Sequence, residues 1–233
     1  MPCRLSPTAA SLELTRDLIL NEEVSPRVAN TWLMALNFIP SVDQAMMETA
    51  GGLLQVRQPA VRTRARLAVG AVLHQYCRQH ADCQTNHVAL EIMAEMARPL
   101  GDSCRADTEQ DEKQLLLTLR SIGNAGLSPP GVVNTLNECF LSRDNPARVK
   151  VSAIEAFRRF SCRVHRDAMR AVFRDLAEDS EVRIAAYLGL MRCPSHQEIG
   201  LVRAALEQEQ VNQVGSFVWT HLSNYRRRHL RTS

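Results

Sequence analysis

Apolar residues recur at three- and four-residue steps along much of the chain, with polar residues between them. In one such segment the apolar positions are Leu115, Leu119, Ile122 and Ala125. This spacing predicts a helix with a single apolar face. Gly126 can adopt the left-handed conformation that ends a helix, and Ser128-Pro129 offers an N-cap followed by a first-turn proline. The segment therefore predicts a helix, a sharp turn and the start of a second helix. We interpret its Gly and Asn residues as serving backbone geometry.

Signals for starting a helix recur along the chain. They are Ser6-Pro7, Ser25-Pro26, Ser128-Pro129 and Asn145-Pro146, which pair a cap with a proline, and Ser180-Glu181 and Ser195-His196, which lack the proline. Gly51-Gly52 interrupts one helical run and predicts a boundary or bend there. No segment alternates in the manner of a strand bounded by hairpin turns. The pattern predicts an all-α chain of about a dozen helices.

A regular series of helices with short turns favours an α-solenoid over a globular bundle. The segment 184–191 is apolar on all sides, so we expect it to be covered from two directions, as in a two-layered array. We see no linker long enough to divide two domains, and we expect one helical domain over residues 1–233.

Composition narrows the class of protein. With 45% apolar and 23% charged residues, the chain has the make-up of a folded protein. The net charge is only +3, arginines are interleaved with carboxylates, and aromatic residues make up 5%, so a nucleic-acid partner is not expected. No window approaches 18 uncharged apolar residues, which excludes a predicted transmembrane helix. Arg4, Glu13, Arg16 and Asp17 interrupt any apolar stretch of a secretory signal at the start of the chain.

Motifs of catalysis are lacking. The sequence contains no Gly-x-Ser-x-Gly, no His-Glu-x-x-His, no phosphate-binding loop and no Gly-x-Gly-x-x-Gly. Its histidines are scattered, and we interpret His221 as a residue that packs between helices. We therefore expect a protein that is not an enzyme and that uses no cofactor.

The seven cysteines allow several interpretations. They are Cys3, Cys77, Cys83, Cys104, Cys139, Cys162 and Cys193, and they do not form paired Cys-x-x-Cys clusters, so a zinc ribbon is not expected. Cys77, His80 and Cys83 are residue types that commonly bind metal ions, but no fourth metal ligand is evident. Cys77 and Cys83 could instead form a disulfide that closes a short loop. Cys104 and Cys139 flank the helix–turn–helix at its two ends, where antiparallel packing would bring them together. Such a bridge is typical of an oxidising compartment, and the alternative is reduced cysteines packed as small apolar residues.

Several blocks of sequence resemble one family, the large lipid transfer proteins. The blocks are Val69–Cys77, Ile122–Gly126, Ala147–Phe157, Asp179–Pro194 and Gln213–Leu222, and they stand in family order over residues 65–225. The family contains vitellogenins, apolipoprotein B, insect apolipophorins and the large subunit of microsomal triglyceride transfer protein. This resemblance implies the family's helical subdomain, a right-handed, two-layered α-superhelix shaped like a horseshoe.

In the family, that subdomain wraps around β-sheets that line a lipid cavity, and an N-terminal β-barrel precedes it. The resemblance implies transport of lipids such as phospholipid, triglyceride or cholesteryl ester, without catalysis, in a secreted or endoplasmic-reticulum protein. It also implies a disulfide between Cys104 and Cys139, with Cys77–Cys83 as a second candidate. Possible protein partners are a disulfide isomerase or a lipoprotein-family member.

The chain differs from the family in extent. We expect the β-barrel and the lipid-lining sheets to be absent from residues 1–233, so that the chain is either a fragment of a longer carrier or a truncated relative. The alternative function is a cytoplasmic α-solenoid that binds proteins and has no lipid role.

Overall fold

The computed structural model describes residues 8–101 and 104–229. Within these ranges the chain forms twelve α-helices and four short 3-10 helices, with no strand, so the all-α prediction is confirmed. The α-helices are α1 (Ala9–Leu20), α2 (Pro26–Ala35), α3 (Gln44–Gly51), α4 (Pro59–Gln79), α5 (His87–Ala97), α6 (Glu109–Ala125), α7 (Pro130–Leu141), α8 (Ala147–Glu155), α9 (Asp167–Arg174), α10 (Ser180–Met191), α11 (His196–Glu207) and α12 (Asn212–His229). The 3-10 helices are η1 (Leu36–Phe38), η2 (Gly52–Gln55), η3 (Arg98–Leu100) and η4 (Ala156–Arg159).

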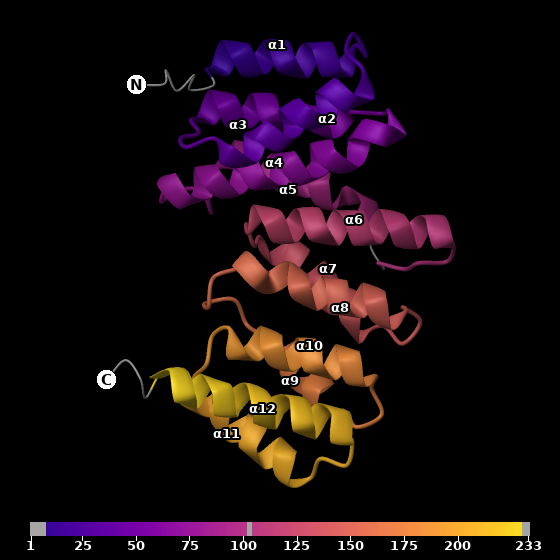
Figure 1. Ribbon diagram of the computed structural model, residues 1–233, viewed down its shortest axis with the longest axis vertical. Coiled ribbons are helices and arrows are strands. Elements are labelled where there is room, and N and C mark those ends of the chain that lie inside the picture. The colour runs from indigo at the N-terminus through magenta and orange to yellow at the C-terminus, as the bar shows by residue number, and fades with distance from the viewer. Residues whose placement is uncertain (1–7, 102–103, 230–233) are drawn as a thin grey trace.

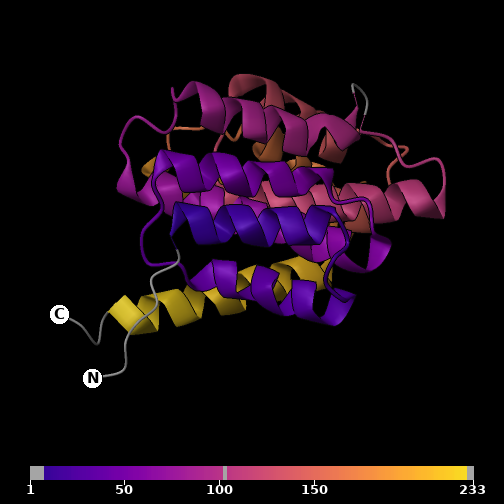
Figure 2. The same ribbon diagram turned by 90° about the horizontal axis from the view of Figure 1, so that it is seen from above.

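The helices form two layers. The even-numbered helices from α2 to α12 each contact the next even-numbered helix, and we call this set the even layer. On the other side α1 contacts α3, α3 contacts α5, and α7 contacts α9. Successive helices form antiparallel pairs, and the pairs stack along the long axis (Figure 1), with helix axes running in similar directions when seen from above (Figure 2). The expected two-layered α-superhelix is thus confirmed.

Local sequence signals predicted several helix ends correctly. The hydroxyl of Ser25 accepts from the Val28 N–H and the hydroxyl of Ser195 accepts from the Glu198 N–H, so both predicted caps are confirmed. Gly126 ends α6 in the left-handed conformation, with φ of 72°. The predicted boundary at Gly51-Gly52 is where α3 ends and η2 begins.

Other predicted starts shift by a residue. Helix α7 begins at Pro130 with Pro129 at the cap position, one residue later than predicted. The cap of α10 is Asp179 rather than Ser180, because its carboxylate accepts from two N–H groups, those of Glu181 and Val182. The predicted start at Ser6-Pro7 lies outside the described residues.

The core runs continuously between the two layers. The predicted apolar stripe of α6 is buried along its length, at Leu115, Leu119, Ile122 and Ala125. Helix α10 contacts α8, α9 and α12, but it is not buried around its whole circumference. Ala186, Tyr187 and Leu190 are fully buried, whereas Leu188 is 38% exposed. The prediction that α10 is covered from two directions is confirmed, because α9 packs on it from the other layer and α8 and α12 from its own, although Leu188 leaves one apolar face partly open.

Candidate functional site

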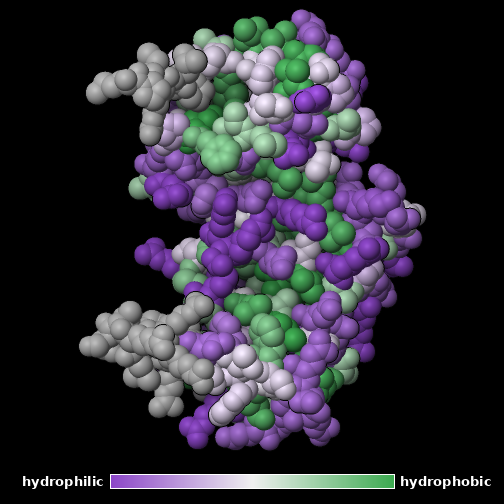
Figure 3. Space-filling model, viewed as in Figure 1, coloured by the Kyte–Doolittle hydropathy of each residue, from purple (hydrophilic) through white to green (hydrophobic). Residues whose placement is uncertain are grey.

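The open face of α10 is the floor of an apolar groove on the even layer. The groove has a volume of about 740 Å³, which is typical of ligand-binding sites. Its apolar wall residues include Val151, Ile154, Phe157, Ile184, Leu188 and Phe217. Figure 3 shows a hydrophobic area over α8, α10 and α12, directly below a hydrophilic band.

Close packing of α10 on its neighbours decides which face is left open. A side chain at Gly189 would place its Cβ 2.7 Å from the sulfur of Met169, so glycine lets α9 and α10 approach closely. On the α12 side, the hydroxyl of Tyr187 lies 2.7 Å from Nδ1 of His221. Burial raises the pKa of Tyr187 to about 12, so this hydroxyl stays neutral. His221, predicted to pack between helices, thus holds α12 beside the groove.

A group of arginines lies at one end of the groove. Arg120, Arg158 and Arg192 line the groove itself, and Arg78 and Arg159 act electrostatically on their neighbours; we call these five residues the arginine cluster. Among the described side chains, none of the five forms an ion pair. Glu155 and Glu181 also line the groove, so positive charges outnumber negative ones there.

The helix–turn segment singled out in the sequence anchors this cluster. The side-chain oxygen of Asn124 accepts from Nη2 of Arg158 at 2.6 Å, and its backbone carbonyl accepts from Nη1 of Arg159 at 2.6 Å. Nη2 of Arg158 also donates to the carbonyl of Arg120 at 2.9 Å. Our interpretation that the Gly and Asn residues of this segment serve backbone geometry holds for Gly126 but is wrong for Asn124, because Asn124 fixes two arginines that lie more than 30 residues away.

Gly123 provides the space for that anchoring. A Cβ at this position would overlap the guanidinium of Arg158 and lie 3.0 Å from the Cα of Ala156. The second contact is to backbone, which cannot move aside as a flexible side chain can.

The charges of the cluster act on one another. Burial, followed by the charge of Arg159, lowers the pKa of Arg158. Burial and then the charge of Arg78 lower the pKa of Arg159. The pKa of the nearby His74 is also lowered, first by burial and then by Arg159. The structure thus concentrates positive charge at the end of an apolar groove.

Replacing Gly123 with alanine is expected to lower the free energy of unfolding by about 1–3 kcal/mol, because it forces Arg158 and η4 away from α6. Urea denaturation measures this. The matched control is Gly131→Ala on α7, where an added Cβ meets nothing within 4 Å. The control is expected to be neutral or stabilising by up to about 1 kcal/mol, since alanine favours helix. Equal effects at the two positions would contradict the role assigned to Gly123.

The structure joins Cys104 and Cys139 in a disulfide, with their Cα atoms 5.1 Å apart. Both residues are fully buried. Asn145, predicted to cap α8, instead donates its amide hydrogens to the carbonyls of Cys104 at 2.8 Å and of Cys139 at 2.9 Å. This prediction failed because the side-chain oxygen of Asn145, the atom that would cap a helix, instead accepts from the Ala106 N–H at 3.4 Å.

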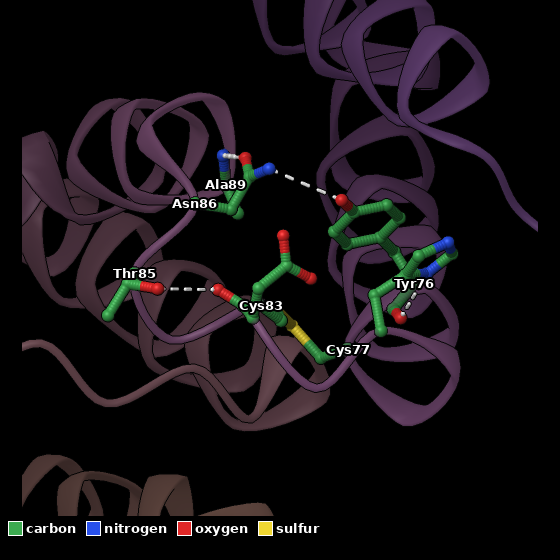
Figure 4. Close-up of a disulfide and its surroundings, with 8 residues drawn as sticks. Tyr76, Cys77, Cys83, Thr85, Asn86 and Ala89 are labelled. Atoms are coloured by element: carbon green, nitrogen blue, oxygen red, sulfur yellow. Dashed lines mark hydrogen bonds between the residues drawn. A yellow bond between two sulfur atoms is a disulfide. The ribbon is translucent and has the colours of Figure 1, made fainter.

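Cys77 and Cys83 are also joined, between the end of α4 and the turn before α5 (Figure 4). Beside them, the Asn86 amide donates to the Tyr76 hydroxyl at 3.2 Å and accepts from the Ala89 N–H at 3.0 Å, which caps α5. The disulfide uses the sulfur atoms of both cysteines that were considered as metal ligands together with His80. His80 stacks on Tyr76, with ring centroids 4.1 Å apart.

A third disulfide, Cys162–Cys193, was missed by the sequence analysis. It joins the loop after η4 to the end of α10, across 31 residues. The spacing in the sequence could have predicted this pair, since Cys162 and Cys193 flank a helical hairpin much as Cys104 and Cys139 do across 35 residues.

In the part of the chain that the structure describes, no group of three His, Cys, Asp or Glu side chains is placed to hold a metal ion. None of the described helices combines the length and the apolar character that crossing a bilayer requires.

Comparison with known proteins gives consistent matches. The family described as the vitellogenin TPR domain matches residues 6–223. Apolipophorins from Locusta migratoria are 29% identical over 218 residues, which is 93% of this chain and 6% of that protein. Apolipoprotein B-100 from Homo sapiens is 29% identical over 199 residues, covering 83% of this chain and 4% of the relative. Vitellogenin from Acipenser transmontanus is 23% identical over 235 residues, covering 95% of this chain and 13% of the relative.

Among solved structures, one of lipovitellin, described as reporting lipid–protein interactions, superposes with a TM-score of 0.75 at 22% identity. The superposition covers 93% of this chain and 23% of the lipovitellin chain. The chain therefore spans only a small part of the length of the proteins it matches.

Proposed function

Since the chain belongs to the vitellogenin TPR domain family, we propose that it acts as the non-catalytic helical wall of a lipid-carrying protein. The observation that carries this proposal is the open apolar groove on the even layer. An uncovered apolar surface of this kind marks a binding face, because leaving it in water costs free energy. Lipid, or the β-sheets that hold lipid in larger relatives, would cover it.

Three disulfides agree with a secreted protein or one that resides in the endoplasmic reticulum. Oxidising compartments are where such bonds form and persist. We therefore propose that the chain acts outside the cytoplasm, with phospholipid or a neutral lipid such as triglyceride as its cargo.

Transfer of fluorescent phospholipid and triglyceride between vesicles tests this function. We expect weak transfer by the purified chain alone, and a clear increase when β-sheet segments of an apolipophorin are supplied, because the groove covers only one side of a ligand. If the chain binds neither those segments nor lipid, the proposal is overturned. Binding of the segments without lipid would favour the alternative, a scaffold that binds proteins.

A charged side chain in the groove gives a sharper comparison. Leu188→Glu places a carboxylate on the groove floor at a residue that is 38% exposed, so folding should be preserved. We expect at least about a tenfold loss of lipid association, since burying an unpaired charge is costly. Ile199→Glu is the matched control, because Ile199 is 51% exposed and lies on α11, outside the groove. Equal losses in the two variants would contradict a role for the groove.

A further inference from the structure

The arginine cluster brings like charges together without an ion pair to any of them among the described side chains, whereas several other arginines of the chain are paired with carboxylates. Arg148 pairs with Glu112, Arg170 with Glu198, and Arg183 with Glu209. At the end of the groove, by contrast, no described carboxylate pairs with any of the five arginines. Such a concentration of like charge is unfavourable without a counter-ion, and it therefore points to an anionic partner.

Donor groups for that partner are available. Arg158 directs three hydrogen bonds to protein oxygens, which fixes its guanidinium at the groove. The guanidiniums of Arg120 and Arg192 line the same groove and make no hydrogen bond to a described group. Planar N–H donors from three arginines thus border the same groove. A phosphate suits them better than a single carboxylate, because its oxygens can accept from more than one arginine.

The apolar part of the groove indicates what kind of molecule bears the anionic group. Away from the arginines, its floor and walls are the aliphatic and aromatic side chains of α8, α10 and α12, which offer few hydrogen-bonding groups. An extended acidic peptide laid there would leave its backbone N–H and C=O groups unpaired. Acyl chains have no such groups. An amphiphile with one anionic head therefore matches both parts of the surface.

We propose that the arginine cluster binds the phosphate of a phospholipid whose acyl chains lie in the apolar groove. This inference rests on the proposed lipid-carrying function and adds the headgroup and its position. Arg120, Arg158 and Arg192 contact the phosphate, and Arg78 and Arg159 strengthen the field that attracts it. Glu155 and Glu181, also at the groove, disfavour heads with additional negative groups.

Binding of water-soluble short-chain lipids to the purified chain tests the proposal. The probes are dihexanoyl phosphatidic acid, dihexanoyl glycerol, which lacks the phosphate, and glycerol phosphate, which lacks the chains. We expect titration calorimetry to show binding of the complete lipid at least about tenfold tighter than either part, because only the complete lipid makes both the charge-assisted hydrogen bonds and the apolar contacts. Equal binding of phosphatidic acid and dihexanoyl glycerol would overturn the headgroup site while leaving lipid carriage intact. Binding of neither would overturn both.

Paired variants separate a defined site from general charge attraction. In Arg120→Gln/Arg192→Gln both residues are exposed and their guanidiniums have no recorded hydrogen bond, so the fold should be unaffected. We expect about a tenfold loss of phosphatidic acid binding and no change for dihexanoyl glycerol. Arg64→Gln/Arg174→Gln removes the same charge from exposed arginines outside the groove and should change neither.

Two results of these variants would overturn the proposal. One is an equal loss of phosphatidic acid binding in both double variants, which would indicate non-specific attraction. The other is cluster-dependent binding of a glutamate-rich peptide with no binding of phosphatidic acid, which would assign the surface to an acidic polypeptide.

Discussion

Replacing Cys104 and Cys139 together with alanine is expected to lower the free energy of unfolding by about 4 kcal/mol. The disulfide closes a loop across 35 residues that contains all of α6 and most of α7. Removing it frees this loop in the unfolded chain, and a longer loop gains more entropy. Loss of both sulfurs also leaves space at two fully buried positions. The hairpin that anchors the arginine cluster would then lose its clamp.

Urea denaturation without reductant measures this effect, and peptide mapping of the native chain checks the three pairings beforehand. The matched control is Cys77→Ala/Cys83→Ala, which opens a loop across only 6 residues. We expect about 2 kcal/mol for the control. An equal or smaller effect at Cys104 and Cys139 would contradict the account based on loop length. Free thiols at these two positions in native protein would contradict the pairing itself.

The sequence predicted the elements whose signals are local. Ser25, Ser195 and Gly126 act on the backbone within four residues of themselves, so their roles could be inferred without knowing the fold. The same holds for the buried stripe of α6, because its period of apolar residues depends only on helix geometry. The two-layered arrangement followed from the repetition of such hairpins.

What the sequence did not predict depends on long-range contacts. Asn124 binds Arg158 across 34 residues and Asn145 binds Cys104 across 41 residues. Neither partner is marked by any local pattern. The apolar segment 184–191 was recognised, but its pattern could not tell which face the neighbouring helices would leave open. The groove therefore emerged only when α8, α10 and α12 were placed together.

Replacing Arg183 with methionine is the second change for which we expect a large loss, about 3–5 kcal/mol in the free energy of unfolding. The Arg183 side chain is 1% exposed and pairs with Glu209, which is 4% exposed, at 2.6 Å between Nη2 and Oε2. Its Nε also donates to the Phe173 carbonyl at 3.2 Å. These contacts attach the turn between α11 and α12 to α10, which sets the position of the α12 wall of the groove. The variant leaves the Glu209 carboxylate buried without its partner.

The control is the double variant Arg183→Met/Glu209→Met, which leaves no buried charge and should lose much less stability than the single variant. The pH dependence gives a second test. Burial alone raises the pKa of Glu209, but hydrogen bonds from Arg183 and from the Val211 N–H outweigh it, so the pKa is lowered in the folded chain. The stabilisation from this pair is therefore complete above the unfolded pKa of about 4.3 and is lost as the pH falls through the folded value.

In Arg183→Met the burial of Glu209 remains while its guanidinium partner is gone, so the folded pKa of this carboxyl should rise above the unfolded value. Its protonation then favours folding, so the difference in stability between the variant and the natural chain should begin to shrink as the pH falls through the variant's raised folded pKa, above about 4.3. It should shrink further below about 4.3, as the pH falls toward the lowered folded pKa of Glu209 in the natural chain. Urea midpoints measured across the acid range give this difference directly. If the single and double variants lose equal stability at every pH, the loss comes from packing around Arg183, and the buried charge of Glu209 contributes nothing to it.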